Sequence, residues 1–247
     1  MPTDVPRHLL RLRYARAAEA YFRGLPSEHF MAVTAQATQR EITLESFALV
    51  KARHPGLQYF NDLPIQYPFG SRKQIRQVMP DNLVVIHSEP IKATDSFDVP
   101  LQPVRPFWVV EYVSQNNPRK DYDDSFKKYE RELKVPYYLV FLPGNRGSTL
   151  YHHTGGKYCT ASPNKADRLR IPELNLEIGQ ADGWVRFWYK GKLLPLPAEL
   201  DRQVEETRRQ LRQLQKQARQ AEERADQERR EKERLLARLR ELGIEPP

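Results

Sequence analysis

Two kinds of hydrophobic pattern divide this chain. Up to about residue 200, short apolar runs alternate with turn residues, whereas from Asp201 to Leu242 the apolar residues keep a heptad spacing without glycine or proline. Short apolar runs bounded by turns are typical of strands in a globular core, and an uninterrupted heptad is typical of a long helix. The sequence therefore predicts a globular domain over residues 1–200 and a charged helix over residues 201–247.

The pattern within residues 1–200 predicts helices packed on a mixed sheet. Strands are expected at Asn82–Ile86, Phe107–Val113, Tyr137–Leu142, Leu150–His153, Lys157–Ala161, Asn175–Ile178 and Trp184–Tyr189. Helices are expected at 7–23, 44–53 and 121–133, and the last has four apolar residues spaced 4, 3 and 4 apart on one face. This helix joins two of the strands as a strand–helix–strand crossover. The expected fold class is α/β, with a mixed central sheet flanked by helices.

The heptad positions of the tail are strongly apolar at the two ends and weak in the middle. They are Leu211, Leu214, Ala218, Ala221, Ala225, Glu228, Lys232, Leu235, Leu239 and Leu242, with Val204 extending the frame backwards. High helix propensity and opposite charges three and four residues apart favour a helix. The pattern leaves two states open, a coiled-coil homodimer and a single solvated helix.

Composition narrows the class of protein. Residues 201–247 hold 13 Lys/Arg and 11 Asp/Glu and no aromatic residue, so of the net charge of +8, +6 belongs to residues 1–200. One cysteine, Cys159, excludes a disulfide framework and a cysteine-based metal site. No stretch approaches the ~18 consecutive apolar residues of a membrane span, and the basic N-terminus has no apolar core typical of a secretory signal. We expect a cytoplasmic protein, whose positive charge is compatible with a nucleic-acid partner.

Two acidic residues stand next to or inside apolar strands. Asp81 follows Pro80 at the start of one strand, and Glu111 interrupts the run FWVVEYV in another. A carboxylate inside such a run is unfavourable unless it reaches water, a partner or a metal. Taken singly, each has an ordinary explanation, a solvent-facing acid or a turn. Together, on neighbouring strands, the two carboxylates can converge, and with phosphate oxygens and waters they form the usual site for Mg²⁺.

A lysine pair on the expected helix 121–133 completes this candidate site. Metal-assisted phosphodiester hydrolysis needs acids that hold the ion and a cation that stabilises the extra negative charge of the transition state. Lys127 and Lys128 both qualify by position. Helical angles do not decide between them, because each lies about 130° from the apolar stripe at 100° per residue, on opposite sides.

The segments MPDNLVVIHSEPI, PFWVVEYVS and KDYDDSFKKYERELKVPYYLVFLP resemble the Uma-type restriction endonucleases, which belong to the PD-(D/E)-x-K superfamily. The resemblance covers most of residues 20–195. It implies a restriction-endonuclease-like core and a Mg²⁺- or Mn²⁺-dependent nuclease site with Asp81 and Glu111 as metal ligands. The superfamily pattern places the lysine two residues after the second acid, where this chain has Val113. The resembling branch takes it from the following helix, and the Lys-Tyr-Glu run favours Lys128.

These inferences give a main hypothesis and an alternative. The main hypothesis is a Mg²⁺-dependent endonuclease acting on DNA, with Asp81, Glu111 and Lys128 as catalytic residues and a C-terminal helix able to form a homodimer. A third carboxylate from an N-terminal helix sometimes assists in this superfamily. Glu41 or Glu45 could supply it, although we expect both to be solvated. The alternative is a catalytically inactive nuclease fold that serves as a DNA-binding or adaptor module through its coiled coil.

Overall fold

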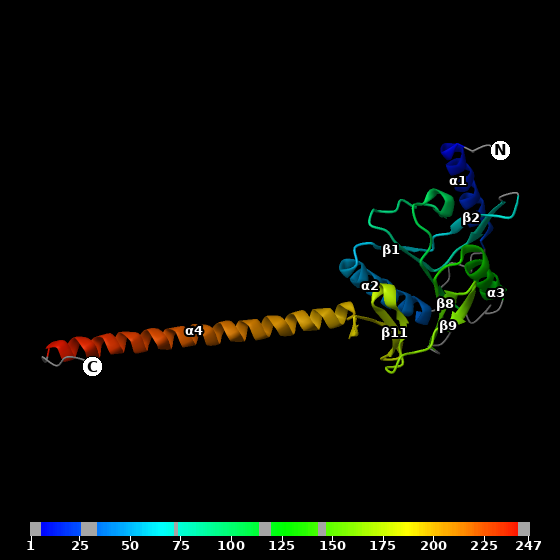
Figure 1. The fold of residues 1–247 in the computed structure, drawn as a ribbon. Helices are drawn as coiled ribbons and strands as arrows, with labels where there is room; N and C mark the ends of the chain where they lie inside the picture. Colours follow the sequence, from blue (N-terminus) through cyan, green and yellow to red (C-terminus); the bar gives the residue numbers. More distant parts are fainter. Residues whose placement is uncertain (1–5, 26–33, 72–73, 114–119, 143–146, 242–247) are drawn as a thin grey trace. The chain divides into compact units, whose positions relative to one another are not determined.

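The computed structural model describes residues 6–25, 34–71, 74–113, 120–142 and 147–241 (Figure 1). The chain divides into two compact units, residues 1–194 and 195–247. The first contains the sheets and most of the helices, and the second consists mainly of one long helix.

The first unit contains all the strands expected from the sequence and six further strands that were not expected. Its helices are α1 (Arg7–Gly24), α2 (Thr34–Arg53), the 3-10 turns η2 (Val99–Leu101) and η5 (Pro172–Leu174), α3 (Lys120–Lys127) and the π-helix η3 (Lys128–Leu133). Its strands are β1 (Leu57–Asn61), β2 (Ile65–Phe69), β3 (Gln74–Val78), β4 (Asn82–Ile86), β5 (Phe97–Asp98), β6 (Trp108–Tyr112), β7 (Tyr137–Phe141), β8 (Ser148–Thr154), β9 (Lys157–Thr160), β10 (Leu169–Ile171), β11 (Leu176–Ala181), β12 (Trp184–Tyr189) and β13 (Lys192–Leu193).

The described strands form three sheets. The central sheet has the order β1-β4-β6-β7-β8-β9, and smaller sheets have the orders β3-β2-β5 and β10-β11-β12-β13. In the central sheet β6 and β7 are parallel, while β4 pairs with β6 and β7 pairs with β8 in antiparallel fashion. The parallel pair needs a crossover connection, which α3 and η3 supply. The predicted mixed sheet and its crossover are confirmed.

Each face of the central sheet buries its own apolar cluster, because side chains alternate between the faces of a strand. On one face, Val84, Trp108 and Leu139 pack with residues of α2 and of the sheet β10-β11-β12-β13. On the other face, Leu83, Val109, Tyr138 and Val140 pack with residues of the sheet β3-β2-β5 and of η3. The unit is therefore layered, with the central sheet in the middle and the π-helix over one of its faces.

The second helix differs from the sequence prediction. It begins at Thr34 rather than near residue 44, so the prediction missed its polar first half. Gln39 lies in this polar half and is buried. Its side-chain amide donates a hydrogen bond to the carbonyl oxygen of Val185 and accepts one from the Val185 N–H, both at 2.9 Å. These two hydrogen bonds tie α2 to β12. Tertiary contacts, rather than an apolar pattern, therefore hold the first half of this helix in place.

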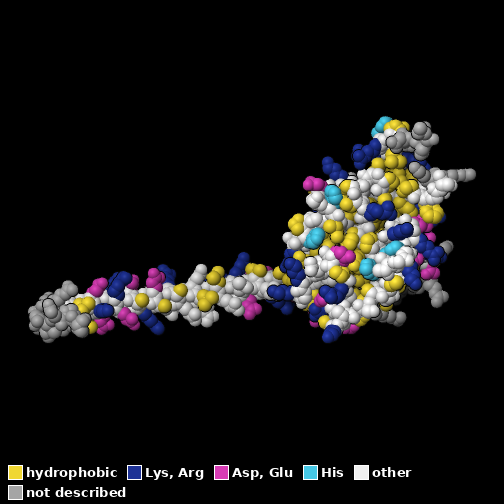
Figure 2. All heavy atoms as spheres, viewed as in Figure 1, with side chains coloured by type: hydrophobic (Ala, Val, Ile, Leu, Met, Phe, Trp, Pro, Cys, Tyr) yellow, Lys and Arg dark blue, Asp and Glu magenta, His cyan; other side chains and the backbone are white. Residues whose placement is uncertain are grey.

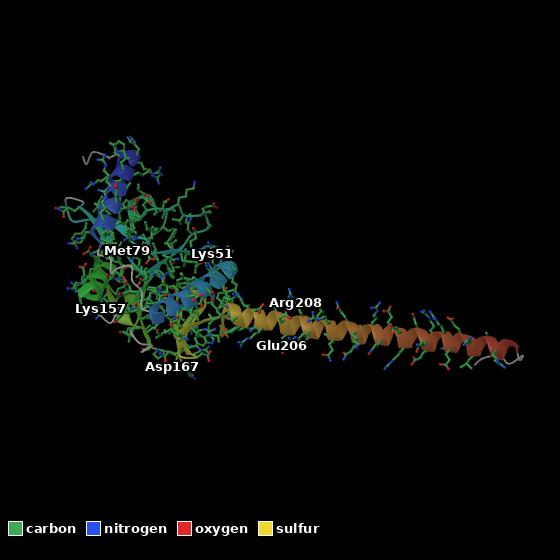
Figure 3. The ribbon with its side chains drawn as sticks, turned by 180° about the vertical axis from the view of Figure 1, so that it is seen from behind. Lys51, Met79, Lys157, Asp167, Glu206 and Arg208 are labelled. Atoms are coloured by element: carbon green, nitrogen blue, oxygen red, sulfur yellow. The ribbon has the colours of Figure 1, made fainter. Side chains whose placement is uncertain are left out.

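The long helix of the second unit is α4 (Pro197–Glu241), with 45 residues. It starts four residues before the predicted Asp201. Proline suits the first helical position because its missing N–H would have no partner there. The Glu199 side chain accepts a hydrogen bond from the Leu196 N–H at 2.8 Å, which caps the first turn. Side chains project all round α4, as Figure 3 shows near Glu206 and Arg208. The predicted long helix is confirmed.

Candidate active site

The central sheet brings the two predicted acids together. β4 and β6 are antiparallel with Asn82 opposite Val110, so one further step along the two strands places Asp81 beside Glu111. A carboxylate oxygen of Asp81 accepts a hydrogen bond from the Tyr112 N–H at 2.7 Å. Asp81 is therefore held against the strand that carries Glu111. Met79, labelled in Figure 3, marks where the chain approaches this point after β3.

Both acids belong to the face of the sheet that the π-helix covers. Leu83 and Val109 pack in the cluster on that face, and side chains two residues apart on a strand share a face. Asp81 is two residues before Leu83, and Glu111 is two residues after Val109. Both acids are partly buried. The strand periodicity thus directs the two carboxylates to the same side.

Tyr129 of the π-helix contacts the site directly. Its buried hydroxyl donates a hydrogen bond to Glu111 Oε1 at 2.8 Å. Burial, followed by the negative charge of Glu111, holds the pKa of the Tyr129 phenol well above its usual range, and the charge of Asp81 adds to this effect. The phenol therefore stays protonated and donates to Glu111 at any physiological pH.

Arg40 of α2 is a neighbour of the site that sequence reasoning missed. Its guanidinium forms an ion pair with Asp62 and lies 3.9 Å from Asp81 Oδ1. Burial raises the pKa of Asp81 to about 6, with a contribution from the charge of Asp62, although the Tyr112 hydrogen bond and Arg40 act in the opposite direction. No sequence signal identified Arg40, because it lies in the polar half of α2 that the apolar pattern did not reveal.

The two candidate lysines differ in their surroundings. Lys127 is the last residue of α3 and is exposed, whereas Lys128 begins the π-helix and its side chain is 21% exposed. The Lys128 ammonium forms an ion pair with Asp124 Oδ2 at 2.6 Å. Lys128 also directly precedes Tyr129, whose hydroxyl contacts Glu111. Of the pair, Lys128 is therefore the more enclosed lysine, and its ammonium is engaged by an acid one helical turn earlier.

The two acids of α2 considered as a third carboxylate of the site differ in their exposure to water. Glu41 is exposed and Glu45 is half-buried. The pKa of Glu45 is raised by burial and by the nearby charge of Glu41. Both remain what the sequence suggested, helix residues in contact with water.

The oxygen atoms of Asp81 and Glu111 are the donors available to a metal ion at this site. Within the described ranges there is no group of three or more His, Cys, Asp or Glu side chains placed to hold an ion. Two carboxylates fit Mg²⁺ or Mn²⁺, which keep several waters and use one or two protein acids together with phosphate oxygens. The oxygen-only donors at this position also suit these hard ions better than zinc or copper.

Comparison with known proteins identifies the family of this chain. The family model Uma2, described as "Putative restriction endonuclease", matches residues 31–182. The crystal structure of a putative nuclease belonging to DUF820 from Anabaena variabilis is similar over 55% of this chain and 73% of that chain, with 14% identity and a TM-score of 0.39. No curated protein matches. None of the helices in the described residues is long and apolar enough to span a membrane. Because the family model covers more than half of the sequence, the chain belongs to the Uma2 family of restriction-endonuclease-like proteins.

Proposed function

We propose that this protein is a Mg²⁺-dependent endonuclease that hydrolyses phosphodiester bonds of double-stranded DNA. One observation carries the proposal: two carboxylates, Asp81 and Glu111, lie side by side on adjacent strands of one sheet face in a chain of this family. Partly buried acids on neighbouring strands of one sheet face are costly for a fold unless they serve a ligand or partner.

The proposed roles follow from the contacts of each residue. Asp81 and Glu111 would hold the ion, which supplies charge neutralisation of the phosphate and a water of lowered pKa. The Tyr112 N–H fixes the Asp81 carboxylate, and the Tyr129 hydroxyl orients Glu111. These contacts favour a pre-organised pair of ligands. Tyr129 is thus a positioning residue rather than a catalytic one.

Lys128 is the proposed cation of the reaction. A phosphodiester carries one negative charge in the ground state and approaches two in the transition state, so a positive group must be placed where the second charge develops. Lys128 is partly enclosed and adjoins the tyrosine that contacts Glu111. Its ion pair with Asp124, an exposed residue, would exchange for contact with the substrate phosphate.

Double-stranded DNA is proposed as substrate from the family and from charge. The family description names a restriction endonuclease, an activity directed at DNA. Residues 1–200 carry a net charge of +6, which favours a polyanionic partner. Binding through Lys and Arg contacts to phosphates should weaken steeply as salt rises.

The test is plasmid nicking and linearisation by the full chain with Mg²⁺ or Mn²⁺, with EDTA as the blank. We expect cleavage with either ion, none in EDTA, and none with Glu111→Gln. The control is Glu89→Gln, the same chemical change at an exposed acid outside the site, which should cleave like wild type. Salt-sensitive DNA binding by Glu111→Gln should remain. DNA binding without cleavage under any divalent ion would contradict the proposal and leave a non-catalytic DNA-binding module, and cleavage of RNA alone would correct the substrate.

A further inference from the structure

The helix α4 exposes an apolar stripe with a polar break in its middle. Val204, Leu211, Leu214 and Leu235 are 44%, 55%, 61% and 61% exposed. Figure 2 shows hydrophobic side chains between basic and acidic ones along this helix. In the heptad frame, Leu211, Ala218, Ala225 and Lys232 occupy a positions, and Leu214, Ala221, Glu228 and Leu235 occupy d positions. A stripe of this kind buries its leucines only by pairing with another helix.

A parallel, in-register pair of α4 helices is opposed by charge. In that arrangement each core residue meets its own copy, so Glu228 would lie against Glu228 and Lys232 against Lys232 of the second chain. The flanking contact between a g residue and the e residue five positions later would also join Arg224 to Arg229 of the second chain. Two like-charged core layers and a like-charged flank make this arrangement unfavourable.

We infer that α4 pairs with α4 of a second copy of this chain in an antiparallel coiled coil centred between Asp226 and Gln227. In this register the a and d positions of opposite helices face each other, which sets Ala225 opposite Glu228 and Ala221 opposite Lys232 of the second copy. Each long charged side chain then lies over a small alanine and can extend its charged end to water. No like-charged core layer remains.

The same register matches the flanking charges and the leucines. It places Glu222 beside Arg229 and Arg224 beside Glu231 of the second copy, and symmetry repeats both pairs. Leu235 of one chain lies opposite Ala218 of the other. A shift of one heptad in one direction sets Arg229 beside Arg229 and Glu231 beside Glu231 of the second copy. A shift in the other direction sets Glu222 beside Glu222 and Arg224 beside Arg224, so both shifted registers lose these four attractive pairs.

The first experiment uses cysteine cross-linking. Cys159, the single cysteine and an exposed one, is replaced by Ser in the full chain. Ala218→Cys and Leu235→Cys are then introduced in separate chains, which are mixed under mild oxidation. We expect a disulfide-linked dimer only in the mixture, because two copies of position 218 would be about 26 Å apart along the axis at 1.5 Å per residue. Efficient self-linking of Ala218→Cys would show a parallel pair, and no linking in any sample would show a single helix; either result overturns the inference.

The second experiment measures dimer affinity by light scattering and sedimentation, with wild type expected at twice the 29.0 kDa chain mass. Arg229→Glu should weaken dimerisation about tenfold, and Glu222→Arg combined with Arg229→Glu should restore it. The control is Arg209→Glu at an outer f position, which should leave affinity unchanged. Because Arg229 also pairs with Asp226 at 2.9 Å within its own helix, circular dichroism checks that helix content is kept. Tighter dimerisation of Arg229→Glu, through relief of Arg224, would contradict the antiparallel register.

Discussion

Charged residues of folded proteins are usually exposed and large apolar residues usually buried, and the two units of this protein depart from this rule in opposite ways. In the first unit, two acids, Asp81 and Glu111, are partly buried on a face of the sheet that is otherwise apolar. In the second unit, leucines of α4 are more than half exposed on a helix that is otherwise charged. A buried charge requires a ligand or partner group, and an exposed apolar stripe requires a partner surface. This difference underlies the two proposals, a metal-dependent reaction in the first unit and self-association through the second.

The largest effect on stability is expected when the same substitution, leucine to alanine, is made in the first unit rather than in the second. Leu139 in β7 is fully buried, so Leu139→Ala should lower the free energy of unfolding of the first unit by about 2–5 kcal/mol. Leu214→Ala in α4 changes an exposed side chain and should leave that unfolding transition unchanged. Thermal and urea unfolding measure both. A loss of similar size for Leu214→Ala would mean that the two units do not differ as described.

The next effect concerns the rate of cleavage. Removing a pre-organised charge from the transition state typically costs about 10²–10³ in rate, so Lys128→Ala should lose that much. Lys127→Ala, an exposed neighbour with the same side chain, is the matched control and should change the rate far less. Single-turnover cleavage of a labelled duplex measures both rates. The reverse order would move the cationic role to Lys127 without changing the proposed chemistry.

Divalent ions should stabilise the first unit through its acids. A ligand that binds only the folded state at 100 times its Kd contributes about 2.7 kcal/mol, which corresponds to a Tm increase of roughly 5–10 °C for a unit of this size. We expect this response to Mg²⁺ or Mn²⁺ in wild type and in Glu89→Gln. Asp81→Asn and Glu111→Gln should lose it. Equal responses in all four proteins would show that these two acids are not the ligands.

The same acids should lower stability when no metal is present. Burial raises the pKa of Asp81 to about 6, above the value for an unfolded chain, so the folded state releases this proton less readily. Stability from this group is therefore lost as pH rises from about 4 to about 6, and the loss is complete above that range. Asp81→Asn removes the penalty and should raise Tm in EDTA at pH 7.5, by roughly 2–4 °C for each kcal/mol of that penalty.

This difference should shrink as the pH falls towards 4, because Asp81 in the folded state is then protonated and the unfolded chain, with its ordinary pKa of 3.8, is losing its charge as well. Melting curves of Asp81→Asn and wild type in EDTA between pH 4 and pH 7.5 measure it. A constant difference across this range would show that the carboxylate charge is not the cause.

The smallest expected effect is the loss of the helix. Residues 1–200 hold every aromatic residue of the chain and all three sheets. Removal of residues 201–247 should therefore shift the Tm of the first unit by less than roughly 2 °C. The measured mass should fall to that of a monomer. A large loss of stability would show that α4 supports the first unit.

The sequence predicts those helices and strands whose own residues show a clear apolar pattern. The strand Asn82–Ile86 was predicted at its observed bounds because four consecutive apolar residues follow Asn82. The heptad frame predicted α4 for a similar reason. By contrast, β3 (Gln74–Val78) was missed because its residues are mostly polar, and it is held by pairing with β2. The first half of α2 was missed for the same kind of reason, since Gln39 is fixed by a strand 146 residues away.

The same limit of sequence-based prediction applies to the residues of the candidate site. Glu111 was identified because it interrupts an apolar strand, and Asp81 because it follows Pro80 at the start of the neighbouring strand. Sequence spacing places Tyr129 only on the apolar face of the helix expected at 121–133. Its hydroxyl contact with Glu111 follows from the packing of η3 on the sheet. Arg40 reaches Asp81 from a helix whose position depends on long-range hydrogen bonds. Partners of this kind cannot be predicted from spacing along the chain.

The π-helix η3 (Lys128–Leu133) also restricts where residues can be inserted into the chain or deleted from it. A π-turn holds one more residue than an α-turn, because its hydrogen bonds join residues five apart rather than four. Deleting one residue there, such as Arg131, would let the segment become α-helical and would rotate Lys128 relative to Leu133 by about 100°. In α4, by contrast, a deletion of seven residues keeps the heptad phase and only shortens the helix by about 10 Å. Insertions and deletions should therefore be tolerated in the second unit in multiples of seven and excluded from this turn.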